Sequence, residues 1–212
     1  IIAGVVALLS GYSMAKLGAR YPSAGGIVEY LAQGFGVGLL SGSLSILLYI
    51  SALIALALVA KTFGSYAVAL LPVERSPMWV KGMGDFIIIA FVLINLEGAR
   101  SVALSEKIIV GTKLLLLASF SVAGLVYARP ELLSPAHYPK SEMILFSLAV
   151  TFFAFEGFRV ITNAAEDMPQ PEKTLPRAML LSIGLVMLLY VVAALAVFGN
   201  LDVKGVIAAK EY

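Results

Sequence analysis

The stretch LFSLAVTFFAFEGFRVITNAAEDMPQPEKTLPR, residues 145–177, decides the fold. It begins as a membrane-spanning helix, but only 13 uncharged residues, from Met143 to Phe155, precede a glutamate, and a bilayer crossing needs about 20. Extending the span to Asn163 gives an adequate length and places Glu156 about 20 Å in from Met143, because a helix rises about 1.5 Å per residue. An ionisable residue at that depth indicates a functional site.

The residues around this carboxylate, FFAFEGF at 152–158, predict a break in the helix near 153–157. Bulky aromatic residues beside a glycine are poor helix formers, and broken backbone at membrane depth requires a polar cavity. The freed carbonyls would bind an ammonium group or a cation, and the amides of the restarted helix would bind an anion. The alternative is an unbroken helix in which Glu156 pairs with Arg159 or with another helix. Residue types alone leave both interpretations open.

Composition places the whole chain in the membrane. Of 212 residues, 60% are hydrophobic and 13% are charged, which predicts a polytopic membrane protein. The net charge of +2 is small and the basic residues are scattered, so we expect no nucleic-acid partner. The chain has no cysteine, and its one histidine, His137, falls in a polar loop, so we expect no metal and no cofactor. Because Ile1 lies inside an apolar run, the sequence reads as one that starts within a longer protein.

We predict an all-α polytopic fold in a single transmembrane domain over residues 1–212. Turn-forming residues at 17–31 predict a chain reversal and a short amphipathic segment, 72–84 is expected to be a loop with Trp79 as an interfacial anchor, and Thr174 is expected to cap the final span. Positive charges divide almost equally between the two sides, which leaves the orientation open. The six predicted spans cover about 1–17, 39–71, 83–99, 105–128, 142–168 with the break near 153–157, and 175–201.

The fourth span contains a lysine, Lys113. It lies about 8 Å in from Ile108, which is shallow enough for its ammonium group to reach the lipid headgroups. The alternative is a cation that points into the helix bundle. The residues leave both positions open.

Three segments resemble the amino acid-polyamine-organocation permeases, which have the leucine-transporter type of fold. The most specific is FFAFEGFRVITNAAEDMPQPEKTLPRAM at 152–179, which is similar to the sixth helix of that family and the loop that follows it. ARYPSAGGIVEYL at 19–31 and TKLLLLASF at 112–120 are similar to two further family segments. The resemblance implies that the chain covers helices two to seven of about twelve, as part of a 5+5 inverted-repeat bundle.

The resemblance also implies a substrate site in the broken helix. Phe153, Ala154 and Glu156 match family positions whose backbone carbonyls hold a substrate amino group, and Phe153 matches an aromatic gate. With the intervening Phe155 and the hinge residue Gly157, these positions form the predicted substrate-binding segment, which we call the 153–157 segment. Glu156 occupies a position that varies in the family, so the resemblance does not assign its side chain a role.

For coupling, Lys113 matches a lysine that sodium-independent members place where related proteins bind sodium. We therefore predict Lys113 as a coupling or protonation residue. Glu156 is predicted as a second one because it is an ionisable side chain at membrane depth. Lys16 departs from the family pattern, because many relatives carry an acidic residue there.

The predicted function is secondary active transport of amino acids or related amines across the cell membrane. It is expected to be proton-coupled or an exchange, sodium-independent, and to work by alternating access. The expected partners are the substrate, the lipid bilayer and protons, and the oligomeric state stays open. The alternative is a nontransporting membrane subunit or receptor that keeps the permease fold. An intramembrane enzyme is not expected, since the sequence offers no nucleophile paired with a base.

Overall fold

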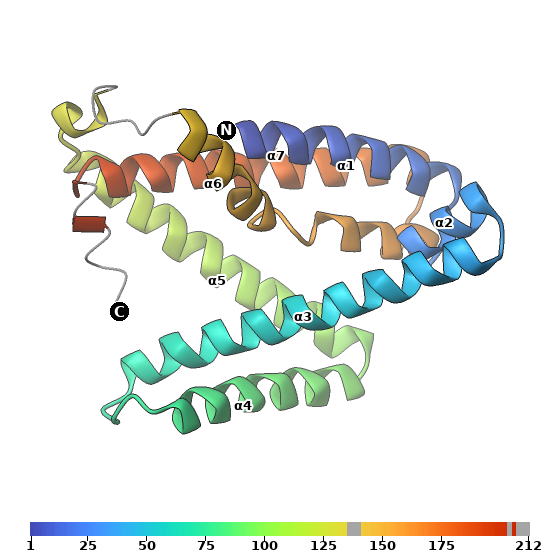
Figure 1. Cartoon of the computed structure of the whole chain (residues 1–212), viewed down its shortest axis with the longest axis horizontal. Helices are drawn as coiled ribbons and strands as arrows, with labels where there is room; N and C mark the ends of the chain where they lie inside the picture. The colour runs from blue at the N-terminus through green and yellow to red at the C-terminus, as the bar shows by residue number, and fades with distance from the viewer. Residues whose placement is uncertain (135–140, 203–204, 207–212) are drawn as a thin grey trace. The chain divides into compact units, whose positions relative to one another are not determined.

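The computed structural model describes residues 1–134, 141–202 and 205–206 of the chain. The described residues are helical with short connections and contain no strand (Figure 1). The elements are α1 (Ile2–Arg20), α2 (Ile27–Phe35), α3 (Leu39–Leu70), α4 (Pro77–Leu96), α5 (Ala99–Val126), η1 (Pro130–Leu133), α6 (Ser141–Phe153), η3 (Phe158–Asp167) and α7 (Pro171–Phe198).

Six helical segments are long and apolar enough to cross a membrane, which confirms the predicted all-α polytopic fold. Five of them are α1, α3, α4, α5 and α7, and the sixth is built from α6 and η3 together, over Ile144–Asp167. The 32 residues of α3 extend for about 48 Å, well beyond the roughly 30 Å hydrocarbon core. This helix must therefore tilt or project from the bilayer.

The helices group into two compact units. The first contains residues 1–45 and the described residues between 118 and 203, and the second contains residues 46–117. Helices α3 and α5 each pass from one unit into the other. The sequence predicts one transmembrane domain, because its apolar runs do not indicate where one packed unit ends and the other begins.

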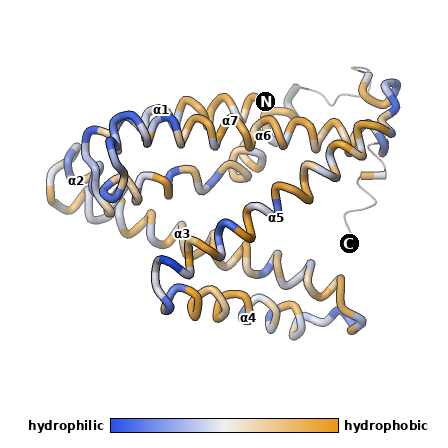
Figure 2. Tube along the Cα trace, turned by 180° about the vertical axis from the view of Figure 1, so that it is seen from behind, coloured by the Kyte–Doolittle hydropathy of each residue, from blue (hydrophilic) through white to orange (hydrophobic). Residues whose placement is uncertain are grey.

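In the first unit, α1 and α7 lie side by side (Figure 1). Small side chains on α1 make this close approach possible, and a Cβ atom on Gly11 would overlap the side chain of Ile183 on α7. Hydrophobic residues colour most of α1 and α7 in Figure 2, while hydrophilic residues gather where α1 leads into α2. The buried core of this unit contains Ala3, Ala7, Ala15, Phe155, Ala165, Leu175, Met179 and Ile183.

In the second unit, α3 and α4 meet at two glycines. A Cβ atom on Gly64 would overlap the backbone carbonyl of Val80, and one on Gly84 would lie 3.1 Å from the Ala60 carbonyl oxygen. The two helix backbones are thus in near contact, with no room for a side chain between them.

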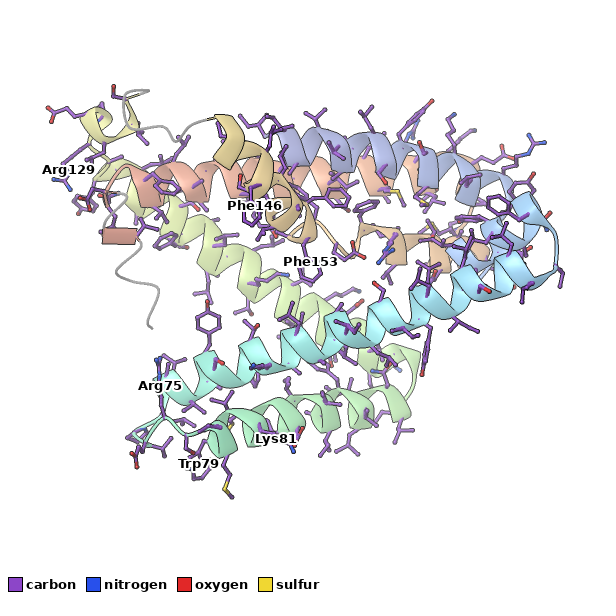
Figure 3. All side chains as sticks on the ribbon, in the orientation of Figure 1. Arg75, Trp79, Lys81, Arg129, Phe146 and Phe153 are labelled. Atoms are coloured by element: carbon purple, nitrogen blue, oxygen red, sulfur yellow. The ribbon has the colours of Figure 1, made fainter. Side chains whose placement is uncertain are left out.

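Helix α4 begins six residues earlier than the predicted span, at Pro77 rather than at 83. Ser76 is the N-cap, and its hydroxyl accepts a hydrogen bond from the Trp79 amide at 3.4 Å. Pro77 suits the first helical position because the amide it lacks would have no partner there. Residues 77–84, predicted as loop, are therefore helical, and Figure 3 shows Trp79 and Lys81 near the start of this helix.

Helix α7 also begins early, at Pro171 rather than at 175. Its N-cap is Gln170, with a left-handed backbone at φ 50°. Thr174 lies inside the first turn and donates its hydroxyl to the Pro169 carbonyl at 2.8 Å, so the prediction that Thr174 caps this helix is wrong. A hydroxyl near a helix start is compatible with the cap or with the first turn. Pro171 suits the first helical position, so the helix begins there and Thr174 lies within it.

Candidate functional site

Helix α6 stops at Phe153, inside the segment where the sequence predicts a break. The amides of Ala154, Phe155 and Glu156 each donate to the carbonyl three residues earlier, at 3.2, 2.9 and 3.0 Å. This pattern is a tightened turn, whereas an α-helix uses the carbonyl four residues earlier. The α-helical hydrogen-bond pattern therefore ends at Phe153, where the 153–157 segment begins.

Gly157 turns the chain after this point. Its φ of 112° lies in the region that side-chain-bearing residues rarely adopt. No heavy atom lies within 4 Å of the position that a Cβ atom would occupy, so the backbone angle, rather than space, requires glycine. The chain then resumes as the 3₁₀-helix η3.

The break leaves backbone polar groups weakly paired on both sides of Gly157. Residues 154–157 form a turn, and within the described part of the chain no hydrogen bond of standard geometry reaches the carbonyls of Phe155 and Glu156 or the amides of Gly157, Phe158 and Arg159. Unpaired carbonyls attract a cation and unpaired amides at a helix start attract an anion. A short segment thus offers both kinds of partner to a molecule that carries both charges.

One carbonyl in the break is held from another helix. The hydroxyl of Tyr190 on α7 donates to the Ala154 carbonyl at 2.9 Å. The Tyr190 ring also meets the Phe155 ring edge to face, with centroids 5.3 Å apart and an interplanar angle of 69°. Sequence reasoning missed Tyr190. The available signal was a phenol in an apolar helix, since such a hydroxyl needs a hydrogen-bond partner.

The side chains of the 153–157 segment point to different surroundings. The Phe155 ring is buried, at 7% exposure, in the core that α1 and α7 form, so only its backbone is available to a ligand. Phe153, at the end of α6 in Figure 3, is 44% exposed. Glu156 is partly buried and forms an ion pair with Arg159. The sequence offered this ion pair as a feature of an unbroken helix, but the structure combines the pair with the break.

Lys113 lies in the second unit, on α5, and is described there by itself. Its side chain is exposed and borders a hollow of about 570 Å³ that is otherwise almost wholly apolar. The other residues that line this hollow are Ile108, Ile109, Thr112, Leu116 and Leu117. The structure thus brings together Phe153, Ala154, Phe155, Glu156 and Gly157 in the first unit, and Lys113 is not among them.

The far end of η3 is fixed to the segment that follows α1. The Ala24 amide donates to the Glu166 carboxylate at 2.9 Å, and the buried Thr162 donates its hydroxyl to the Arg159 carbonyl at 2.7 Å. Tyr30 of α2 is 8% exposed, and its buried hydroxyl has no hydrogen-bond partner among the described residues. Burial raises the pKa of this phenol, which the nearby Thr162 hydroxyl partly offsets.

No group of three histidine, aspartate or glutamate side chains suited to a metal ion occurs among residues 1–134, 141–202 and 205–206.

A model of the amino acid permease family matches residues 1–209. The chain is 35% identical to the inner membrane transport protein YbaT of Escherichia coli over 202 residues, which are 94% of this chain and 46% of that protein. It is 29% identical to the serine/threonine exchanger SteT of Bacillus subtilis over 219 residues, which are 100% of this chain and 47% of SteT.

An uncharacterised protein of Methanocaldococcus jannaschii is 37% identical over 214 residues, covering 100% of this chain and 49% of that protein. The chain thus spans about half the length of the curated relatives it matches. The family match and the six apolar helices make it a multi-pass integral protein of the cell membrane. The chain belongs to the amino acid permease family, within the amino acid-polyamine-organocation superfamily.

Proposed function

We propose that the protein is a secondary active transporter of amino acids or related amines that binds its substrate at the 153–157 segment. The observation that carries this proposal is the pair of weakly paired carbonyls at Phe155 and Glu156, in a helix that otherwise has the length and hydropathy of a membrane span. Carbonyls without a good donor at membrane depth are costly, and an ammonium group satisfies them. The SteT relative is named as an exchanger of serine and threonine, which supports the substrate class and the exchange mode.

Within this proposal Phe153 is the gate. Its ring is the exposed aromatic of the segment, at 44% exposure, whereas Phe155 is fixed in the core. A movable ring beside the free carbonyls would exclude water when it closes over a substrate. Gly157 would act as the hinge, because a left-handed glycine adjoins η3 and packs against nothing.

Alternating access is the proposed mode of transport. Within the first unit, η3 packs against α1 and α7, and α6 packs against α1. The broken helix would therefore move together with these two helices.

Coupling is assigned to Lys113 and Glu156, and transport is proposed to be independent of sodium. Lys113 places a cationic side chain beside an apolar hollow, which supports this role. Glu156 is the ionisable side chain of the 153–157 segment. It pairs with Arg159, and we propose that it exchanges this partner during transport.

Uptake by the full-length protein in reconstituted vesicles tests the function. The panel contains labelled L-serine, L-alanine, L-leucine, L-arginine and putrescine, each measured with and without a proton gradient, a sodium gradient or internal substrate. We expect saturable uptake of at least one panel member that a sodium gradient does not change. Saturable binding without flux would instead establish a nontransporting permease-like protein.

Two substitutions separate the coupling roles. Lys113→Ala is expected to abolish or reshape the pH dependence of uptake, while Lys107→Ala, at an exposed position of the same helix, should leave it unchanged. Glu156→Gln keeps the shape of the side chain and removes its charge, with Glu172→Gln at the start of α7 as the control. A pH profile that Lys113→Ala does not alter would remove Lys113 from the mechanism, and the same result for Glu156→Gln would leave Glu156 a structural contact.

A further inference from the structure

We propose that Tyr190 is a positioning residue for recognition of the substrate's ammonium group. The inference rests on the proposed function of the 153–157 segment and adds to it a side chain from α7. The observation behind it is the hydrogen bond from the Tyr190 hydroxyl to the Ala154 carbonyl, at 2.9 Å across 36 residues of sequence.

This bond fixes the first carbonyl of the break. The Ala154 amide is already held by a turn bond at 3.2 Å, so the hydroxyl fixes the opposite end of the same residue. The next two carbonyls, those of Phe155 and Glu156, accept no hydrogen bond of standard geometry in the described residues and follow directly along the chain. Their directions therefore depend on how firmly Ala154 is held.

Contacts of the Tyr190 ring fix the place of its hydroxyl. Tyr190 meets Phe155 edge to face, and the Phe155 ring is buried. A Cβ atom on Gly4 of α1 would lie 3.3 Å from the Phe155 ring, so α1 closes the other side. Packing therefore fixes the position of the Tyr190 ring, and its hydroxyl forms the hydrogen bond to Ala154.

The hydrogen-bonding groups of Tyr190 and Ala154 favour a cationic ligand. A phenol has one proton to donate, and Tyr190 gives it to Ala154, so its oxygen retains only acceptor capacity. The Ala154 carbonyl uses one of its two lone pairs in this bond. With the weakly paired carbonyls of Phe155 and Glu156, the break presents acceptors and no competing side-chain proton from Tyr190. Tyr190 as a whole is 37% exposed.

An ammonium group is the ligand chemistry that fits such a set of acceptors, and the Glu156 carboxylate does not replace them because Arg159 already pairs with it. Discrimination between an amine and its deaminated analogue should then depend on the Tyr190 hydroxyl. A ligand without the ammonium group has nothing to donate to these oxygens.

The test is Tyr190→Phe in the full-length protein, which removes the hydroxyl and keeps the ring. The probes are the best substrate of the uptake panel and the same molecule without its amino group, for example L-serine and 3-hydroxypropionate, the latter measured as a competitor. Hydrogen bonds to charged groups predict that KM for the amine rises about tenfold or more. We expect Vmax to stay within about twofold and the Ki of the deaminated competitor to stay unchanged, because only ground-state binding of the ammonium group is lost.

The matched control is Tyr127→Phe, a phenol that is 77% exposed at the end of α5. It should change neither constant. A Tyr190→Phe protein that binds both probes with equal loss, or whose KM for the amine stays within twofold of the unsubstituted protein, overturns the inference. If the unsubstituted protein takes up no panel member, the proposed function itself fails, so the two failures are distinguishable.

Discussion

The Glu166 carboxylate accepts a hydrogen bond from the Ala24 backbone amide at 2.9 Å, although 142 residues separate them. The bond joins the last part of η3 to the turn between α1 and α2. Both residues belong to the first unit, so the contact fixes one end of the resumed helix to the body that carries α1. The other end of η3 begins at Gly157, beside which a Cβ atom would meet nothing within 4 Å.

Glu166→Ala should loosen this turn. An amide bonded to a charged oxygen is more stable than one bonded to water, but the pair is exposed, so we expect a loss of about 1 kcal/mol, equivalent to roughly fivefold faster hydrogen exchange at Ala24. Exchange measured by mass spectrometry on the purified protein reports this directly. The control is Asp167→Ala, which removes a neighbouring carboxylate with no hydrogen bond or ion pair in the described residues. Equal exchange in both variants would show that the bond does not stabilise the turn.

Tyr30→Phe should stabilise the protein slightly. The Tyr30 hydroxyl is buried without a hydrogen-bond partner in the described part of the chain, and an unpaired buried hydroxyl costs on the order of 1 kcal/mol or more. Phenylalanine keeps the ring between α1 and η3 and removes that cost. Thermal unfolding in detergent should show a higher Tm. A clear decrease would mean that the hydroxyl has a partner, such as Thr162.

The same phenol predicts a response to alkaline pH. Because burial raises the pKa of Tyr30 above its ordinary value of 10.0, the folded protein favours the neutral form. The stabilisation is complete below pH 10.0 and is lost as the pH rises through the higher folded pKa. Tyr30→Phe should therefore reduce the slope of stability against pH above 10.0, measured as Tm at a series of pH values. An identical slope would exclude a contribution from Tyr30.

Gly157→Ala should destabilise the break. Alanine at φ 112° is strained, and such strain costs about 1 to 3 kcal/mol, which the empty space around the residue cannot relieve. We expect a lower Tm and reduced uptake. The control is Gly184→Ala on α7, where no atom lies within 4 Å of the new methyl group and the helix should gain up to about 1 kcal/mol. Opposite signs for the two changes are the expected result, and an equal effect would show that the left-handed backbone is unimportant.

Gly64→Ala should separate α3 from α4. The new methyl group would overlap the Val80 backbone carbonyl, and a backbone atom cannot turn aside as a side chain can. We expect a destabilisation of about 1 to 3 kcal/mol, seen as a fall in Tm. Gly42→Ala, earlier on the same helix with no atom within 4 Å, should not lower Tm. If the two variants unfold at the same temperature, the near contact of the helices carries no packing constraint.

The sequence determined the class of the fold and the identity of the central segment. Apolar run lengths depend on the thickness of the bilayer, so the six crossings could be read without coordinates. The composition around Glu156 and Gly157 indicated a break but was also compatible with an unbroken helix. The end of α6 at Phe153 and the left-handed backbone of Gly157 decided between the two. The helix starts at Pro77 and Pro171 were missed because apolar periodicity does not report where a cap forms.

Only the tertiary structure decided what holds the break in place. The bond from Tyr190 to Ala154 and that from Ala24 to Glu166 join residues far apart in the chain, and local pattern carries no information about such pairs. The burial of Phe155 and the exposure of Phe153 likewise depend on which face of the turn meets α1 and α7. Side-chain composition determines which segments of the chain enter the membrane. The direction in which each carbonyl and side chain at the break points depends instead on packing between helices.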